Sequence, residues 1–257
     1  MKNYMFKVRF LFLSVVLWGM TLALSAQPAT KTLFIYGGQA NKPFVKYVAN
    51  LTGKENPKIC FLPTATGDRA TYINFWYDLC HDLPVEPYVQ KVWISSNSQT
   101  QTFEEVLMGM DAIIVGGGNT LNMLAIWQAQ GIDQVLRKAY DKRIILAGGS
   151  AGSLCWFEGG TTDSRPVELG IVEGLAFLPY SHCPHYSSEA SRRPLYFDNI
   201  KSGALNPGYA CDDLSGIVFR DGKVEKAVSL DDKNHAYHVS LKEGEIVETR
   251  LESEIIK

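Results

Sequence analysis

The stretch that decides the fold is residues 143–156, which read RIILAGGSAGSLCW. Residues 143–147 are typical of a buried strand, and the apolar segment after the glycines suits a helix. Between them, Gly148, Ser150 and Gly152 form the pattern G-x-S-x-G of a nucleophile elbow. This turn is so tight that side chains beside the serine would collide, and it presents the hydroxyl next to backbone N–H groups that can bind an oxyanion. We favour this interpretation over a plain glycine-rich connection.

A second glycine cluster ends another predicted strand. Residues 111–120 read DAIIVGGGNT, with the strand over 111–115 and a helix that opens at Thr120. Three glycines let backbone N–H groups approach a ligand, as a phosphate cradle or as half of an oxyanion hole. The cluster has neither G-x-G-x-x-G with a following ribose acid nor the Lys-Ser/Thr of a nucleotide loop, so the oxyanion role fits better.

Apolar runs and helix-period segments alternate along most of the chain. Strands are predicted over 32–36, 58–62, 85–94, 111–115 and 143–147, with helical spacing between them. This alternation predicts an α/β fold whose mostly parallel sheet is covered on both faces.

The texture changes after about Gly160. Asp221-Gly222 and Glu243-Gly244 each separate two strand-like runs, as hairpin turns do. We therefore expect the C-terminal part to add antiparallel strands to the same sheet. No linker is evident, so residues 27–257 are expected to form a single domain.

Residues 1–26 are typical of a secretory signal peptide. Basic residues precede an uncharged apolar run over 10–24, and small residues then lead to a polar break. The run is shorter than the roughly 20 residues that span a bilayer, which favours cleavage over a permanent anchor. We expect cleavage after Ser25 or Ala26 and a periplasmic or secreted protein with no stable membrane insertion.

Composition excludes several classes of protein. Hydrophobic residues make up 46% of the 257 residues and charged residues 20%, which excludes disordered and collagen-like chains. The formal net charge is −2, and loss of the basic leader makes it more negative. Nucleic-acid binders usually have the opposite sign, so no nucleic-acid partner is expected.

The cysteine spacing contains no C-x-x-C pair and no zinc pattern. Several of the five cysteines lie in apolar surroundings, where a cysteine is usually a small core residue. We expect buried thiols, and neither a metal nor a cofactor.

Five motifs, in chain order, resemble the peptidase E and cyanophycinase family of serine peptidases. They are Gly116-Gly117-Gly118-Asn119-Thr120, Gly148-Gly149-Ser150-Ala151-Gly152, Thr161-Thr162-Asp163, Pro184-His185-Tyr186 and Asp212-Asp213. The match covers roughly residues 33–239. It implies a three-layer, flavodoxin-like fold similar to class I glutamine amidotransferases, with a serine in place of the amidotransferase cysteine.

The resemblance also implies roles for single residues. Ser150 would be the nucleophile and His185 the general base, with an oxyanion hole from the N–H groups of Ala151 and of Gly117 or Gly118. A histidine base needs one acid to hold its tautomer. We assign Asp213 to that task and give Asp163, the second acid of the family pattern, a supporting catalytic role.

The family's preference for aspartate implies a cation for the substrate carboxylate. Arg192 and Arg193, seven and eight residues after His185, are candidates, although solvated loop charges explain them about as well. Asn119 is a third candidate for substrate binding. The expected substrate is a small peptide, such as an Asp-X dipeptide or an aspartate-linked peptide, cleaved through an acyl-enzyme.

Two other hypotheses stay open. Ser150, Asp213 and His238 follow the order Ser, Asp, His of α/β-hydrolases, which would make the protein an esterase. The chain could also be a non-catalytic binding protein, because fold alone does not imply activity. The presence of nucleophile, base and acid favours the enzyme. Of the remaining histidines, we expect His182 in a loop and assign it no catalytic role.

Overall fold

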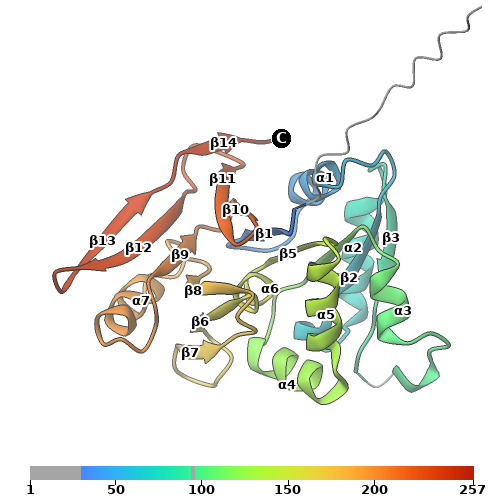
Figure 1. Ribbon diagram of the computed structural model, residues 1–257, viewed down its shortest axis with the longest axis horizontal. Helices are drawn as coiled ribbons and strands as arrows, with labels where there is room; N and C mark the ends of the chain where they lie inside the picture. The colour runs from blue at the N-terminus through green and yellow to red at the C-terminus, as the bar shows by residue number, and fades with distance from the viewer. Residues whose placement is uncertain (1–29, 94–95) are drawn as a thin grey trace, which may run out of the picture.

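The computed structural model describes residues 30–93 and 96–257 (Figure 1). The predicted signal peptide and Ile94 lie outside the described residues. Within the described part of the predicted strand 85–94, only Glu86–Val89 forms a strand.

A large sheet forms the centre of the fold, in the order β14-β11-β10-β1-β5-β4-β2-β3. The five strands from β1 to β3 in that order are parallel, whereas β10 is antiparallel to both β1 and β11. The bounds are β1 Thr32–Tyr36, β2 Lys58–Leu62, β3 Glu86–Val89, β4 Ala112–Val115, β5 Ile145–Gly149, β10 Ser215–Arg220, β11 Lys223–Ser229 and β14 Ser253–Ile255. The predicted mostly parallel sheet is confirmed.

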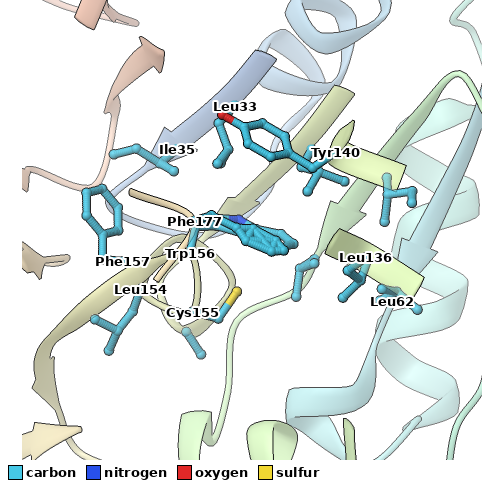
Figure 2. Close-up of a cluster of buried hydrophobic side chains, with 14 of the residues drawn as sticks. Leu33, Ile35, Leu62, Leu136, Tyr140, Leu154, Cys155, Trp156, Phe157 and Phe177 are labelled. Atoms are coloured by element: carbon cyan, nitrogen blue, oxygen red, sulfur yellow. The ribbon is translucent and has the colours of Figure 1, made fainter. Parts of the chain in front are cut away.

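Helices cover both faces of this sheet. Side chains along β1 point alternately to the two sides, so each face presents apolar groups that a helix layer can bury. Leu33 and Ile35 pack in one core cluster with residues of α4 and α5, and Figure 2 shows part of this cluster. Phe34 and Tyr36 pack in the opposite cluster with residues of α1 and α2. The helices are α1 Lys42–Leu51, α2 Ala70–Cys80, α3 Phe103–Met108, α4 Thr120–Gln130, α5 Ile132–Asp141, α6 Ala151–Leu154 and α7 Arg192–Lys201, with short 3-10 turns η1 Thr64–Thr66 and η2 Ser96–Ser98.

A second sheet corrects the prediction that all the late strands extend the first. Its order is β13-β12-β9-β8-β6-β7, with bounds β6 Phe157–Thr162, β7 Gly170–Glu173, β8 Leu178–Cys183, β9 Gly208–Cys211, β12 Ala236–Lys242 and β13 Glu245–Arg250. Of the described strands after β5, those that join the first sheet are β10, β11 and β14. An alternating strand pattern shows which face is buried but not which neighbour the strand pairs with, so the sequence could not separate the two sheets.

The two predicted hairpin turns are confirmed. Asp221 and Gly222 have φ of 47° and 79°, and Glu243 and Gly244 have φ of 52° and 82°. Two consecutive positive φ values suit the right-handed twist of the paired strands. The strand predicted over 143–147 begins only at Ile145, because the chain first makes a turn in which the N–H of Arg143 binds the carbonyl of Tyr140.

All five cysteines are buried and free, which confirms the expected buried thiols. Burial raises the pKa of the Cys60 thiol to about 12, so it stays protonated at neutral pH. In the part of the chain that the structure describes, no helix is long and apolar enough to cross a membrane. The same residues contain no cluster of three or more metal-ligating side chains.

Candidate active site

Ser150 stands in the sharp turn between β5 and α6. Its φ of 53° and ψ of −120° are strained for a residue with a side chain. A Cβ added to Gly148 would lie 2.2 Å from the carbonyl oxygen of Gly152, and one added to Gly152 would lie 2.3 Å from that of Val115. Only glycine fits at these two positions, so the turn has the geometry expected of a nucleophile elbow.

The side chains of Ser150, His185 and Asp213 form one chain of hydrogen bonds. His185 Nε2 lies 2.8 Å from Ser150 Oγ, and His185 Nδ1 lies 2.6 Å from Asp213 Oδ1. Because a carboxylate only accepts, Nδ1 carries the proton and Nε2 is free to accept the serine proton. The arrangement can activate a hydroxyl for attack on a carbonyl carbon.

Three different loops bring these groups together. His185 follows β8 and has a positive φ of 54°, and Asp213 lies between β9 and β10. The N–H of Gly38, just after β1, donates to the carbonyl oxygen of Asp213 at 3.1 Å. Sequence reasoning missed Gly38, although its position directly after a predicted strand was a usable signal.

Backbone N–H groups beside Ser150 are available to bind an oxyanion. A Cβ on Gly117 would lie 3.1 Å from Ser150 Cβ, which places the glycine run against the serine. Within residues 30–93 and 96–257, the N–H groups of Gly117, Gly118 and Ala151 make no hydrogen bond to a protein acceptor. Unpaired donors so close to the nucleophile fit an oxyanion hole.

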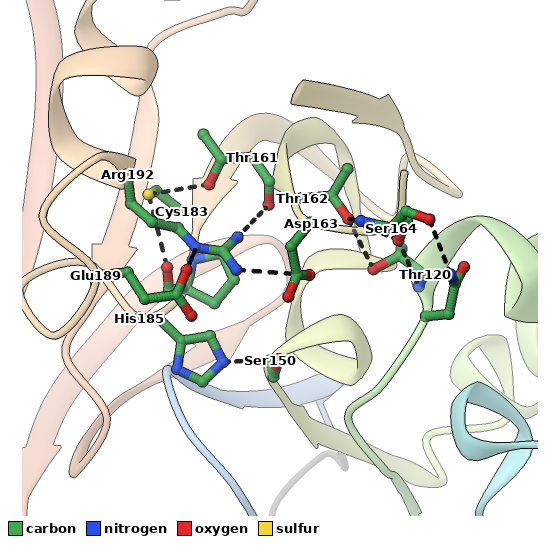
Figure 3. A network of polar contacts seen from close by, with 12 residues as sticks. Thr120, Ser150, Thr161, Thr162, Asp163, Ser164, Cys183, His185, Glu189 and Arg192 are labelled. Atoms are coloured by element: carbon green, nitrogen blue, oxygen red, sulfur yellow. Dashed lines mark hydrogen bonds and ion pairs between the residues drawn. The ribbon is translucent and has the colours of Figure 1, made fainter. Parts of the chain in front are cut away.

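Asp163 does not contact the histidine. Its carboxylate is 67% exposed, and Oδ1 lies 3.6 Å from Arg192 Nη2 (Figure 3). The acid at His185 Nδ1 is Asp213. The geometry therefore gives the orienting position to Asp213 and leaves Asp163 at the end of a separate ion-pair network.

Arg192 and Arg193 are both engaged within the protein. Arg192 is only 2% exposed, and it donates from Nε to Glu189 at 2.6 Å and from Nη1 to the carbonyl of Thr161 at 3.0 Å. Arg193 makes a two-pronged contact with Glu248, at 2.9 and 2.5 Å. The expectation that one of them receives a substrate carboxylate finds no support, because their donors already bind Glu189, Thr161 and Glu248.

Asn119 is a helix cap. Its Oδ1 accepts from the N–H of Asn122 at 2.9 Å, and its Nδ2 donates to the carbonyl of Ser164 at 2.9 Å. Both ends of the amide are used to begin α4 and to tie it to the segment after β6. Its expected role in substrate binding therefore gives way to a structural one.

The esterase hypothesis, with His238 as the base, does not agree with the structure. His238 lies in β12, where it pairs with Tyr209 of β9 and Thr249 of β13. Its ring packs 5.0 Å from that of Tyr209, and burial lowers its pKa. The nitrogen beside Ser150 belongs to His185.

Comparison with known proteins agrees with this geometry. Residues 33–227 match the model of peptidase family S51. The chain belongs to this family. It is 40% identical over 206 residues to the uncharacterized peptidase YgaJ of Bacillus subtilis, covering 80% of this chain and 88% of that protein. A probable alpha-aspartyl dipeptidase of Drosophila melanogaster is 29% identical over 140 residues, 51% of this chain and 58% of the fly protein.

Solved structures share the fold of this S51 chain. A peptidase from an acI-B1 Actinobacterium superposes with a TM-score of 0.67 at 16% identity, over 89% of this chain and 96% of its own. A putative peptidase E protein from Listeria monocytogenes EGD-e gives a TM-score of 0.57 at 19% identity, over 79% and 100%. Together with the family match, they make the protein a serine-type peptidase of the peptidase E kind.

Sequence reasoning about this S51 peptidase also missed the structural importance of His182. The residue is fully buried at the end of β8, not in a loop. Its Nδ1 donates to the carbonyl of Tyr209 at 3.0 Å, and its Nε2 lies 2.9 Å from Ser153 Oγ. Ser153 Oγ also lies 2.7 Å from the carbonyl oxygen of Ser150, and its single proton is donated to one of these two acceptors at a time. His182 thus packs against the elbow through Ser153. Its burial lowers its pKa to about 3.

This pKa predicts a dependence of stability on pH. In the unfolded chain, His182 is protonated below its ordinary pKa of about 6.5. In the native protein, it is protonated only below about pH 3. The free energy of unfolding should therefore fall as pH falls through this window, by about 1.4 kcal/mol per pH unit from this residue. Denaturant unfolding of the native protein and of His182→Gln between pH 7 and pH 4 measures the effect. The variant should show the shallower slope, and parallel curves would contradict the prediction.

Proposed function

We propose that this S51 peptidase hydrolyses small peptides outside the cytoplasm through an acyl-enzyme on Ser150. The observation that carries the proposal is the hydrogen-bonded series Ser150, His185, Asp213. It joins a strained serine to a histidine in the tautomer that accepts its proton.

The mechanism follows from the positions of these groups. His185 Nε2 takes the proton of Ser150 as Oγ attacks the peptide carbonyl carbon. The N–H groups of Ala151 and of Gly117 or Gly118 receive the negative charge on the carbonyl oxygen. The imidazolium, stabilised by Asp213, then gives its proton to the departing amine. Water activated by the same histidine releases the acyl group.

An aspartyl preference, which the name of the fly relative describes for that protein, is the finer alternative for the substrate. The residues near Ser150 offer it little support. The two arginines expected to bind the carboxylate are held by Glu189 and Glu248. We therefore propose small peptides as the substrate class, without an aspartyl preference.

Covalent labelling tests the proposal directly. A fluorophosphonate should modify Ser150 of the native protein and leave the Ser150→Ala variant unlabelled, although that variant retains the nearby Ser153. Peptide mapping by mass spectrometry locates the adduct. Intact mass of protein recovered from cell fractions tests the location, because the proposal requires a chain outside the cytoplasm that begins at Ala26 or Gln27. A native protein that resists the reagent, or that carries it on another serine, would refute catalysis by Ser150.

A further inference from the structure

A cavity of about 150 Å³ opens beside the Ser150 hydroxyl. One wall consists of the glycine run 116–118, Ser150 and His185. The rest of the lining is mostly apolar, with one amide side chain, Gln39, beside Ala40, Phe61, Tyr72, Phe75, Trp76 and Leu79. We call this cavity the aromatic pocket.

The aromatic wall is a continuous face of one helix. Tyr72, Phe75, Trp76 and Leu79 follow the spacing i, i+3, i+4, i+7 along α2, which puts them on one side of it. Trp76 is 1% exposed and stacks on Phe61, with ring centroids 5.3 Å apart and planes at 16°. Both rings line the aromatic pocket. Phe75, which is 41% exposed, stands at the rim.

The residues that line the pocket disfavour the binding of acidic side chains. In the part of the chain that the structure describes, no lysine or arginine lines the pocket, and neither does an aspartate or glutamate. A carboxylate placed there would lose water without gaining a cation, which is unfavourable. An apolar group would lose only unfavourable contact with water. An apolar cavity of about 150 Å³ is also large enough to hold benzene.

We propose that the aromatic pocket binds the apolar or aromatic side chain of a residue next to the scissile bond, so that the enzyme prefers such peptides to aspartyl peptides. The proposal rests on the proposed function, because it takes Ser150 as the attacking group. It names the side chain that the site accepts, which the S51 family match does not. A hydrophobic pocket distinguishes ligands that differ by one methylene by roughly 10- to 200-fold. We expect phenylalanine to exceed aspartate by at least about tenfold.

Two series of dipeptides measure this preference. In X-Ala and Ala-X, X is phenylalanine, leucine, asparagine or aspartate, and kcat/KM is determined for each peptide with the native protein. In one of the two series, phenylalanine and leucine should exceed both asparagine and aspartate. Equal rates, or faster cleavage of aspartyl peptides in both series, would overturn the proposal.

Substitution at the rim provides a matched control. Phe75→Lys puts a cation at the pocket and should reduce the ratio of phenylalanine to aspartate cleavage by about tenfold or more. Tyr77→Lys makes the same charge change on the same helix, at a residue that is similarly exposed (45%) but does not line the pocket. That variant should keep the native ratio. Equal ratios in the two variants would show that Phe75 does not determine specificity and would count against the pocket.

Ligand binding separates this proposal from the proposed function. Calorimetric titration of Ser150→Ala with the phenylalanine and aspartate peptides needs no hydrolysis. Tighter binding of the phenylalanine peptide by about tenfold supports the pocket even if fluorophosphonate fails to label Ser150 in the native protein. Equal or reversed affinities contradict the pocket, even if labelling and cleavage show that Ser150 is catalytic.

Discussion

Ser150→Ala should reduce kcat/KM for a cleaved peptide by on the order of 10⁴ to 10⁶, which is what loss of a nucleophile costs in serine hydrolases. Without the hydroxyl, His185 Nε2 has no proton to accept and no acyl-enzyme can form. Alanine has the same Cβ as serine, so it adopts φ of 53° with similar strain and the fold should persist. Kinetic assay and thermal unfolding of the purified variant measure the two effects separately.

Ser191→Ala is the matched control for this experiment. Ser191 is exposed and precedes α7 without a side-chain capping hydrogen bond, so its hydroxyl can be removed at little cost. Activity should stay within about twofold of native. Retention of substantial hydrolysis in Ser150→Ala, with stability unchanged, would exclude Ser150 as the nucleophile.

Asp213→Asn should lower kcat by on the order of 10⁴, although the two side chains have the same shape. Asp213 now accepts the Nδ1 proton of His185 at 2.6 Å. An asparagine amide can donate to Nδ1 instead, which moves the ring proton to Nε2 and prevents that atom from accepting the serine proton. The change is thus in tautomer, not in position.

Asp163→Asn provides the comparison that decides between the two acids. The Asp163 carboxylate is 67% exposed and pairs with Arg192 at 3.6 Å. Arg192 keeps its hydrogen bonds to Glu189 and Thr161 when that pair is weakened. We expect a loss of less than about tenfold. If Asp163→Asn proved far more damaging than Asp213→Asn, the assignment of the orienting acid would be reversed.

Local sequence pattern determined much of this protein. Strands β1 and β2 have the bounds that their apolar runs predict, because a buried strand needs such a run wherever it pairs. The sequence predicts the elbow at Ser150 because only glycine fits at positions 148 and 152. The sequence also predicts the hairpin at Asp221-Gly222, because both turn positions have positive φ and Asp-Gly is a preferred pair there.

The composition of the site depended on contacts across the chain. Ser150 and His185 are 35 residues apart, and His185 and Asp213 are 28 apart. The family resemblance proposed all three residues, but no local rule shows that the ends of β5, β8 and β9 meet, or that Asp213 rather than Asp163 faces the ring. The helical spacing of the aromatic residues on α2 was present in the sequence, but only packing against Phe61 turned that face into a pocket.

The sequence by itself therefore determined the positions of the buried parallel strands, the hairpin turns and the reactive elbow, because steric fit and hydrophobic period act over a few neighbouring residues. Tertiary structure alone decided which strands form the second sheet. It also decided which polar side chains are available to bind a ligand. Arg193 is neutralised by Glu248, 55 residues away, and His182 is kept uncharged by burial at the end of β8. Both outcomes depend on the charge and water around a side chain, and these are set by parts of the chain that the local sequence does not contain.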